Sequence, residues 1–96
     1  DDVAFVTGAS PFGAMHMVGN LWEYCADVFA AYTTTGAGCW GATPQTDPVC
    51  NAAGARVSRG GAYYATAGLD LLAATRDATP ADTGYGSVGF RCARTR

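Results

Sequence analysis

The sequence contains no lysine and few charged residues of either sign. Its 6 basic residues are all arginine, against 8 acidic residues and a formal net charge of −2. A chain without a basic face is not expected to bind nucleic acid. No apolar run approaches the roughly 20 residues that a membrane-spanning helix requires. Charged residues make up 15% and hydrophobic residues 49% of the chain, a composition that argues against intrinsic disorder.

Glycine is abundant in this short chain. The 96 residues include 13 glycines, about twice the average proportion. Such a content predicts turns, loops and close backbone contacts rather than long helices. A chain of this length forms one domain at most, so we expect residues 1–96 to be a single domain or part of one.

The segment from His16 to Tyr24 concentrates the features that organise the chain. Gly19 and Asn20 form a pair that supplies the backbone angles of a sharp turn. Trp22 follows as a candidate core anchor. Glu23 comes next, inside an apolar run, where a carboxylate needs hydrogen-bond donors, an arginine or a metal. The central question is therefore which group Glu23 faces.

Three motifs in order resemble one family. Residues 17–24 (Met-Val-Gly-Asn-Leu-Trp-Glu-Tyr) are similar to the Gly-Asn-x-Trp-Glu-Trp signature of the formylglycine-generating enzyme, or sulfatase-modifying factor, family. Residues 56–63 (Arg-Val-Ser-Arg-Gly-Gly-Ala-Tyr) resemble its Arg-Val-x-Arg-Gly-Gly-Ser-Tyr motif, and residues 89–91 its closing Gly-Phe-Arg. The resemblance covers most of residues 11–96 and corresponds to the C-terminal part of a typical family domain.

The resemblance implies an α+β, C-type-lectin-like fold of short antiparallel strands with much irregular backbone and little helix. Strands are expected at 3–6, at 55–64 on both sides of a bend at Gly60 and Gly61, at 73–76 and at 88–93, with loops at 33–54 and 77–86. Two interpretations of 21–32 stay open. Apolar offsets of three and four residues indicate a short helix, whereas the resemblance favours an extended strand.

The four cysteines predict two disulfides and an oxidising, extracellular or periplasmic compartment. We expect a Cys39–Cys50 bridge, which would tie down the long loop, and a Cys25–Cys92 bridge between the first and last motifs. The alternative is that Cys25 or Cys92 is a free thiol, or pairs with a segment outside this chain.

The founding enzymes of the family bind copper through two cysteines that follow the Gly-Gly-Ser-Tyr motif. Here the corresponding stretch runs from Tyr63 to Asp70, and no cysteine lies between Cys50 and Cys92. Soft Cu(I) requires thiolate ligands, which neither Ala65 nor Asp70 supplies. The copper-dependent oxidation of a sulfatase cysteine therefore does not carry over to this sequence.

Calcium is the cofactor that the resemblance implies for the first motif. Its ligands would be the Glu23 carboxylate, the carbonyls of Gly19 and Leu21, and a side chain at position 16, where an imidazole stands in place of an oxygen ligand. The competing interpretation pairs Glu23 with an arginine, for which the candidates are Arg59, Arg76 and Arg91.

The remaining candidate residues fall into two groups. We expect the three motif arginines to bind carboxylates and carbonyls rather than substrate. The structural group consists of Asn20, Trp22, Arg59, Gly60, Gly61, Arg76, Phe90 and Arg91. Exposed aromatic residues are favoured in binding sites. The candidate binding group consists of Trp40, Tyr63, Tyr64 and Tyr85.

The sequence thus favours a non-catalytic recognition or structural module that is exported and tied by disulfides. One alternative is the C-terminal part of an oxidoreductase whose metal ligands lie elsewhere. Another is a ligand-binding variable protein of a diversity-generating retroelement. A second chain, or an N-terminal half, is the expected partner, because the family's preceding strands normally pair with these.

Overall fold

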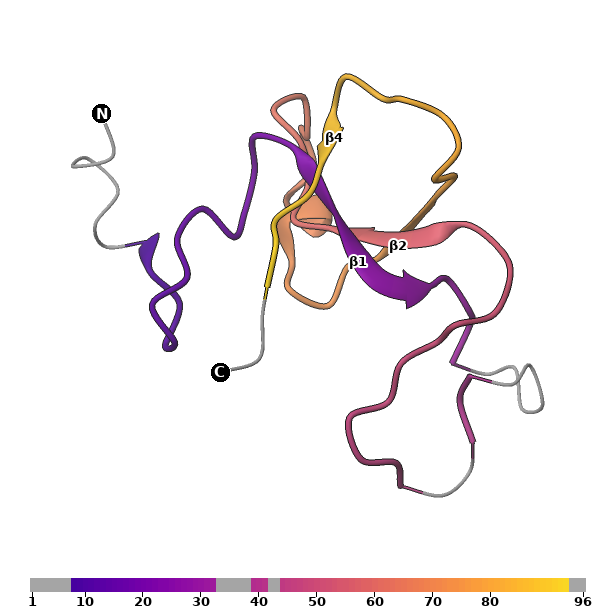
Figure 1. Ribbon diagram of the computed structural model, residues 1–96. Coiled ribbons are helices and arrows are strands. Elements are labelled where there is room, and N and C mark those ends of the chain that lie inside the picture. Colours follow the sequence, from indigo (N-terminus) through magenta and orange to yellow (C-terminus); the bar gives the residue numbers. More distant parts are fainter. Residues whose placement is uncertain (1–7, 33–38, 42–43, 94–96) are drawn as a thin grey trace.

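The computed structural model describes residues 8–32, 39–41 and 44–93 (Figure 1). Within them, four strands form one sheet in the order β3-β2-β1-β4. The elements are β1 (Trp22–Val28), β2 (Arg56–Arg59), the short 3-10 helix η2 (Gly68–Leu71), β3 (Asp77–Thr79) and β4 (Val88–Gly89). The rest of the described chain is turn and irregular backbone, as the glycine content predicts. No helix among the described residues is long and apolar enough to cross a membrane.

Strand β1 resolves the two interpretations of the segment 21–32 in favour of the strand. Gly19 and Asn20 both have positive φ, of 79° and 68°, and turn the chain into β1. The strand then pairs with β2 on one side and β4 on the other. Helical spacing of apolar residues is outweighed here, because sheet pairing and burial of Trp22 and Val28 reward the extended conformation.

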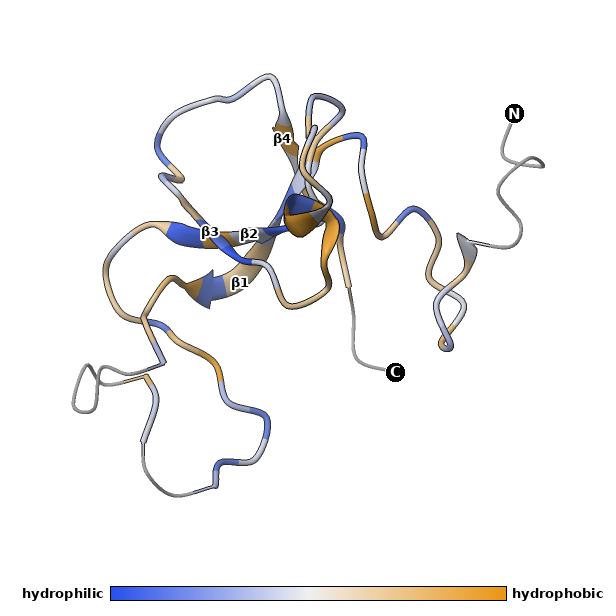
Figure 2. Ribbon diagram, turned by 180° about the vertical axis from the view of Figure 1, so that it is seen from behind, coloured by the Kyte–Doolittle hydropathy of each residue, from blue (hydrophilic) through white to orange (hydrophobic). Residues whose placement is uncertain are grey.

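The sheet is mostly antiparallel, as expected, but one pairing is parallel. Strands β1 and β2 are antiparallel, with Glu23 opposite Arg59 and a register irregularity between Tyr24 and Val28. Strands β2 and β3 are also antiparallel and lie side by side (Figure 2). Strand β4 runs parallel to β1, with Trp22 opposite Val88. The expectation of antiparallel strands alone is therefore wrong for β4.

The Gly60–Gly61 bend joins the first two family motifs. Both residues have positive φ, of 97° and 72°. A Cβ on Gly60 would lie 3.1 Å from the Met17 carbonyl oxygen, and a Cβ on Gly61 would lie 3.1 Å from that of Asp70. The Gly19 N–H donates to the Gly60 carbonyl at 2.7 Å. Glycine is required here because two backbone segments approach the bend closely.

Three sequence-based strand boundaries are corrected. The strand expected directly after the glycine bend, up to residue 64, is absent, because the chain turns at Tyr63 and Tyr64. The strand expected at 73–76 lies later, at β3, inside the segment predicted as a loop, because residues 77–79 are the ones that pair with β2. The closing strand is only β4, and residues 90–93 leave the sheet. The strand expected at 3–6 lies outside the described residues.

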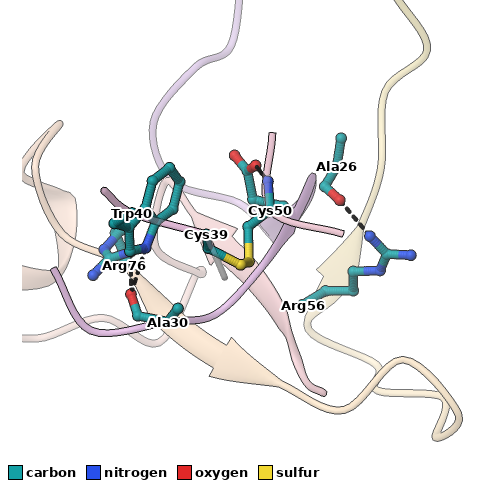
Figure 3. The surroundings of a disulfide bond; sticks show 8 residues. Ala26, Ala30, Cys39, Trp40, Cys50, Arg56 and Arg76 are labelled. Carbon is teal, nitrogen blue, oxygen red and sulfur yellow. Dashed lines mark hydrogen bonds between the residues drawn. A yellow bond between two sulfur atoms is a disulfide. The ribbon is translucent and has the colours of Figure 1, made fainter. Parts of the chain in front are cut away.

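The Cys39–Cys50 bridge is present, as predicted (Figure 3). Its Cα atoms lie 4.8 Å apart, and it packs with buried Val28 at the end of β1. The Cys50 N–H donates to Asp27 Oδ1 at 2.8 Å, and the Val28 N–H donates to the Cys50 carbonyl at 2.9 Å. The bridge therefore anchors the long loop to the end of β1.

The second predicted bridge, Cys25–Cys92, is wrong for this structure, in which both thiols are free. The extent of the pairing explains why. Strand β4 ends at Gly89, which is opposite Glu23, so Cys92 lies beyond the part of the chain that pairs with β1. Cys25 directly follows Tyr24, where the pairing of β1 with β2 becomes irregular. The sheet therefore does not bring these two cysteines together.

Candidate functional site

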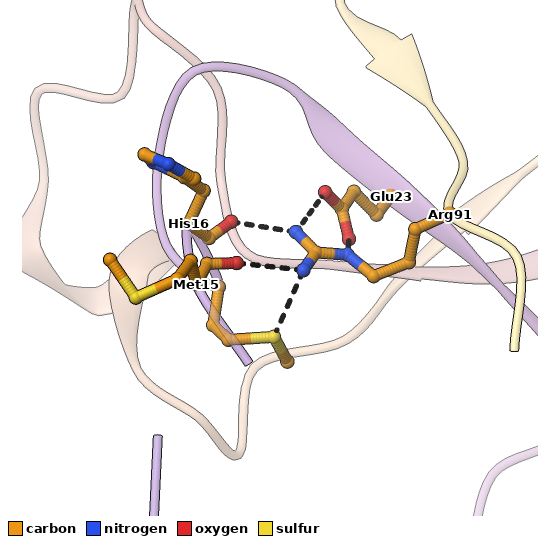
Figure 4. A network of polar contacts seen from close by, with 5 residues as sticks. Met15, His16, Glu23 and Arg91 are labelled. Carbon is orange, nitrogen blue, oxygen red and sulfur yellow. Dashed lines mark hydrogen bonds and ion pairs between the residues drawn. The ribbon is translucent and has the colours of Figure 1, made fainter. Parts of the chain in front are cut away.

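The carboxylate of Glu23 faces Arg91 (Figure 4). Arg91 Nε donates to Oε2 and Nη2 donates to Oε1, each at 2.5 Å, which makes a two-pronged pair. The same guanidinium donates to the carbonyls of Met15 at 2.8 Å and His16 at 2.7 Å, and Nη1 lies 3.4 Å from the sulfur of Met17. One arginine thus ties the segment before the Gly-Asn turn to β1.

Of the three arginines proposed as partners of Glu23, the structure selects Arg91. Donation of hydrogen bonds to the Glu23 carboxylate raises the pKa of the Arg91 guanidinium, which stays charged. The side chains of Arg91 and Glu23 are 39% and 30% exposed, so solvent screens their attraction. The arrangement therefore fixes geometry more than it adds stability.

A cavity of about 180 Å³ adjoins this pair and includes the residues proposed to bind calcium. Both oxygens of Glu23 accept from Arg91, and the Gly19 carbonyl accepts the Leu21 N–H at 2.9 Å. His16 has a left-handed φ of 55° and contributes its carbonyl to Arg91. Calcium takes six to eight oxygen ligands. This donor set does not fit calcium as it stands, because Arg91 holds both oxygens of Glu23, and we expect no calcium-dependent stabilisation.

A transition-metal site has no better basis in the described part of the chain. No group of three or more His, Cys, Asp or Glu side chains that could hold a metal ion occurs there. Ala65 and Asp70 occupy a turn and η2, where the Ala65 N–H donates to the Ala62 carbonyl at 2.9 Å. Burial raises the pKa of the Cys25 thiol, and the nearby Arg59 guanidinium opposes that shift. Cys25 is thus a half-buried thiol rather than an activated thiolate.

The other two motif arginines bind backbone carbonyls. Arg59 Nη1 donates to Ala73 at 2.7 Å and to Thr75 at 3.2 Å. Arg76 Nη1 donates to Ala30 at 3.2 Å, and its guanidinium carbon lies 3.8 Å from the ring centroid of Tyr32. These contacts match the structural roles expected from the sequence, because irregular segments contain carbonyls that need donors.

The candidate binding aromatics separate into two places. Trp40 packs beside the disulfide, its ring centroid 5.6 Å from that of Tyr32, and its Nε1 donates to the Ala30 carbonyl at 3.2 Å. Tyr63 is 74% exposed and stands edge-on to Tyr64, with centroids 5.3 Å apart. Trp40 therefore has a structural position, and only Tyr64 and Tyr85 of the four line a common cavity.

We call that cavity the aromatic pocket. Its volume is about 200 Å³, and its lining consists of Trp22, Tyr64, Asp77, Ala78, Thr79, Pro80, Tyr85, Ser87 and Val88. The hydroxyl groups of Tyr64 and Ser87 lie 3.5 Å apart on its wall. Phe90, expected to be structural, is instead 77% exposed and lies at the other cavity, beside Glu23.

Sequence reasoning missed Asp77, Thr79 and Ser87 as pocket residues. Asp77 was assigned to a loop, and its face is fixed only by pairing with Ser58 of β2. Ser58 and Thr79 are buried, and their hydroxyl oxygens lie 2.8 Å apart. A Ser and a Thr in short strands gave no sequence signal for this contact.

Comparison with known proteins agrees with the three motifs. The family model described as "Sulfatase-modifying factor enzyme 1-like domain" matches residues 4–96. A formylglycine-generating enzyme of Streptomyces coelicolor is 33% identical over 84 residues, which cover 84% of this chain and 25% of the relative. The chain thus spans about a quarter of that relative. No solved structure matches. The family match and the shared motifs together establish that this chain belongs to the sulfatase-modifying factor enzyme 1-like family.

Proposed function

We propose that this chain is a non-catalytic recognition module built on part of a formylglycine-generating-enzyme-like domain. One observation carries the proposal: Ala65 and Asp70 stand where the family resemblance places the copper-binding cysteines. Without thiolates there, soft Cu(I) has no ligands at the position that defines the oxidase.

The two free cysteines do not replace the missing pair. Cys25 lies on β1 and is half-buried beside Arg59, whereas Cys92 follows β4 and is exposed. Cys92 lies beyond the end of β4, and the two cysteines form no bridge with each other. Their separate positions support a binding role over thiolate chemistry.

The finer features of the proposal are the C-type-lectin-like fold, export and a partner that completes the domain. The antiparallel-rich sheet with little helix supports the fold, and the Cys39–Cys50 bridge supports an oxidising compartment. The partner would be the N-terminal part of the domain or a second chain. Its support is that this chain spans 25% of its relative and that β3 and β4 are sheet edges.

The test is turnover of a Cys-x-Pro-x-Arg peptide with Cu(I) and oxygen, followed by mass spectrometry. The proposal predicts unchanged peptide, and the Streptomyces coelicolor relative serves as the reference protein. Formylglycine product above the level of a protein-free control would overturn the proposal. Purification of the material from its native source would show whether a second chain completes the domain.

A further inference from the structure

We propose that the aromatic pocket binds a primary alkylammonium group on an aliphatic stem, as in a lysine side chain. This inference rests on the recognition role proposed above and names the ligand chemistry for it. The pocket of about 200 Å³ combines three aromatic side chains with one carboxylate, that of Asp77. It lies on the opposite face of the sheet from Glu23, because Asp77 and Ser58 align with Tyr24.

The charge of the pocket favours a cation. Asp77 is the only charged residue among the described residues that line it. The arginines of the described chain are committed to other places. Arg91 binds Glu23, Arg59 binds the Ala73 carbonyl, Arg56 binds the Ala26 carbonyl and Arg76 binds the Ala30 carbonyl. No described arginine lines the pocket to neutralise Asp77, so a cationic ligand is electrostatically favoured there.

The polar atoms suit an ammonium better than a guanidinium. An ammonium has three donors and no acceptor, and the pocket lining offers the Asp77 carboxylate and the Ser87 hydroxyl as acceptors. The Thr79 hydroxyl is paired with that of Ser58. Asp77 Oδ1 already accepts the Ala78 N–H at 2.8 Å. Two-pronged binding of a guanidinium uses both carboxylate oxygens. A compact ammonium needs only one of them.

The aromatic walls suit the rest of the ligand. Trp22, Tyr64 and Tyr85 provide apolar surface for a methylene stem. Aromatic rings near an ammonium also attract it through their electron-rich faces. The chain contains no lysine, so it cannot fill the pocket with a lysine of its own. The ammonium group must therefore come from outside these 96 residues.

The experiment is an NMR titration of the 96-residue chain with Nα-acetyl-lysine methylamide. The control probe is Nα-acetyl-norleucine methylamide, which keeps the stem and lacks the ammonium. We expect shifts of Trp22, Tyr64 and Tyr85 resonances and about tenfold tighter binding of the lysine probe, which equals about 1.4 kcal/mol. Equal affinity for the two probes, or no shifts at these residues, would overturn the proposal.

Matched variants test the carboxylate. Asp77→Asn keeps the shape and the acceptor for the Ala78 N–H, and should weaken lysine-probe binding by about tenfold. Asp47→Asn makes the same charge change outside the pocket, at a residue whose φ of 45° asparagine tolerates. It should leave the affinity unchanged. Equal losses in the two variants would mean that only net charge matters, and would contradict the assignment to Asp77.

A third probe, n-butylammonium, separates the two sources of this chemistry. Affinity equal to that of the lysine probe assigns the pocket to free amines, and weaker affinity assigns it to a lysine within a polypeptide. Both results support the ammonium site. The ligand proposal and the recognition proposal can fail separately. If the chain does not prefer the lysine probe and also does not convert the peptide, only the ligand assignment is wrong. If formylglycine forms, the recognition role itself is wrong.

Discussion

Two carboxylates in one small sheet have opposite surroundings. Glu23 lies on one face, and both of its carboxylate oxygens accept hydrogen bonds from Arg91. Arg91 also donates to the carbonyls of Met15 and His16. Asp77 lies on the other face, in a pocket with aromatic walls and no described arginine. The carboxylate in the family motif therefore serves the fold, while the one outside the motifs is available to a ligand. The motif residues Glu23 and Arg91 thus bind each other, and Arg91 also binds the backbone.

Of the changes that test this comparison, Trp22→Ala is expected to lower the stability of the fold the most. Trp22 is 9% exposed, is the first residue of β1 and also lines the aromatic pocket. Removing a buried indole should lower the free energy of unfolding by about 3–5 kcal/mol. Urea denaturation followed by circular dichroism measures the change. A midpoint equal to that of the wild type would show that β1 is not anchored by this residue.

The next largest loss of stability is expected from removal of the Cys39–Cys50 bridge. The bridge spans a sequence separation of 11 residues, and a loop of that size contributes about 3 kcal/mol on the chain-entropy account. Cys39→Ser with Cys50→Ser should lower thermal stability by that amount, as measured by calorimetry. Cys25→Ser is the control, because it removes a cysteine that forms no bridge. An equal loss in the control would contradict the role of the bridge.

Neutralising the Glu23 site should cost less. Glu23→Gln keeps an acceptor for Arg91 but loses the charge, and the pair is partly exposed. We expect a loss of about 1 kcal/mol or less in urea denaturation, with lysine-probe binding unchanged. Addition of calcium should leave the melting temperature of the wild type unchanged, because Arg91 holds both oxygens of Glu23. A calcium-dependent rise that Glu23→Gln abolishes would reassign this carboxylate to metal binding.

The smallest effect is a pH dependence from Cys25. Burial raises the pKa of its thiol in the folded state. At alkaline pH the folded chain therefore keeps the thiol proton of Cys25 more often than the unfolded chain does. The resulting stability is complete below the ordinary thiol pKa of about 8.5 and falls as the pH rises above it. Chemical denaturation between neutral and alkaline pH should show this decline. Cys25→Ser should flatten it, and an unchanged slope would exclude Cys25 as the cause.

The sequence predicted the first family motif and the disulfide of the long loop better than the aromatic pocket. The Gly-Asn turn, buried Trp22 and the Cys39–Cys50 bridge follow from local residue chemistry, and the structure confirms them. The choice of Arg91 among three arginines could not be made, because it depends on how β4 lies against β1.

The aromatic pocket depends still more on tertiary pairing. Asp77 reaches it only because β3 aligns with Ser58 of β2, and a shift of one residue would turn its side chain to the other face. The wrong Cys25–Cys92 bridge also depends on tertiary pairing, because β4 ends at Gly89 and Cys92 lies beyond it. Spacing along the chain does not reveal which face a residue occupies once a short strand pairs in parallel, as β4 does with β1.

The most direct test of the central claim is Cu(I) retention during competition with a Cu(I) chelator. The wild-type chain should lose the metal to the chelator, because Ala65 and Asp70 supply no thiolate. Ala65→Cys with Asp70→Cys restores the two cysteines at the family positions and provides the matched comparison, which should retain Cu(I) more strongly. Stoichiometric retention by the wild type, equal to that of the double variant, would contradict the account and return this chain to the copper oxidases.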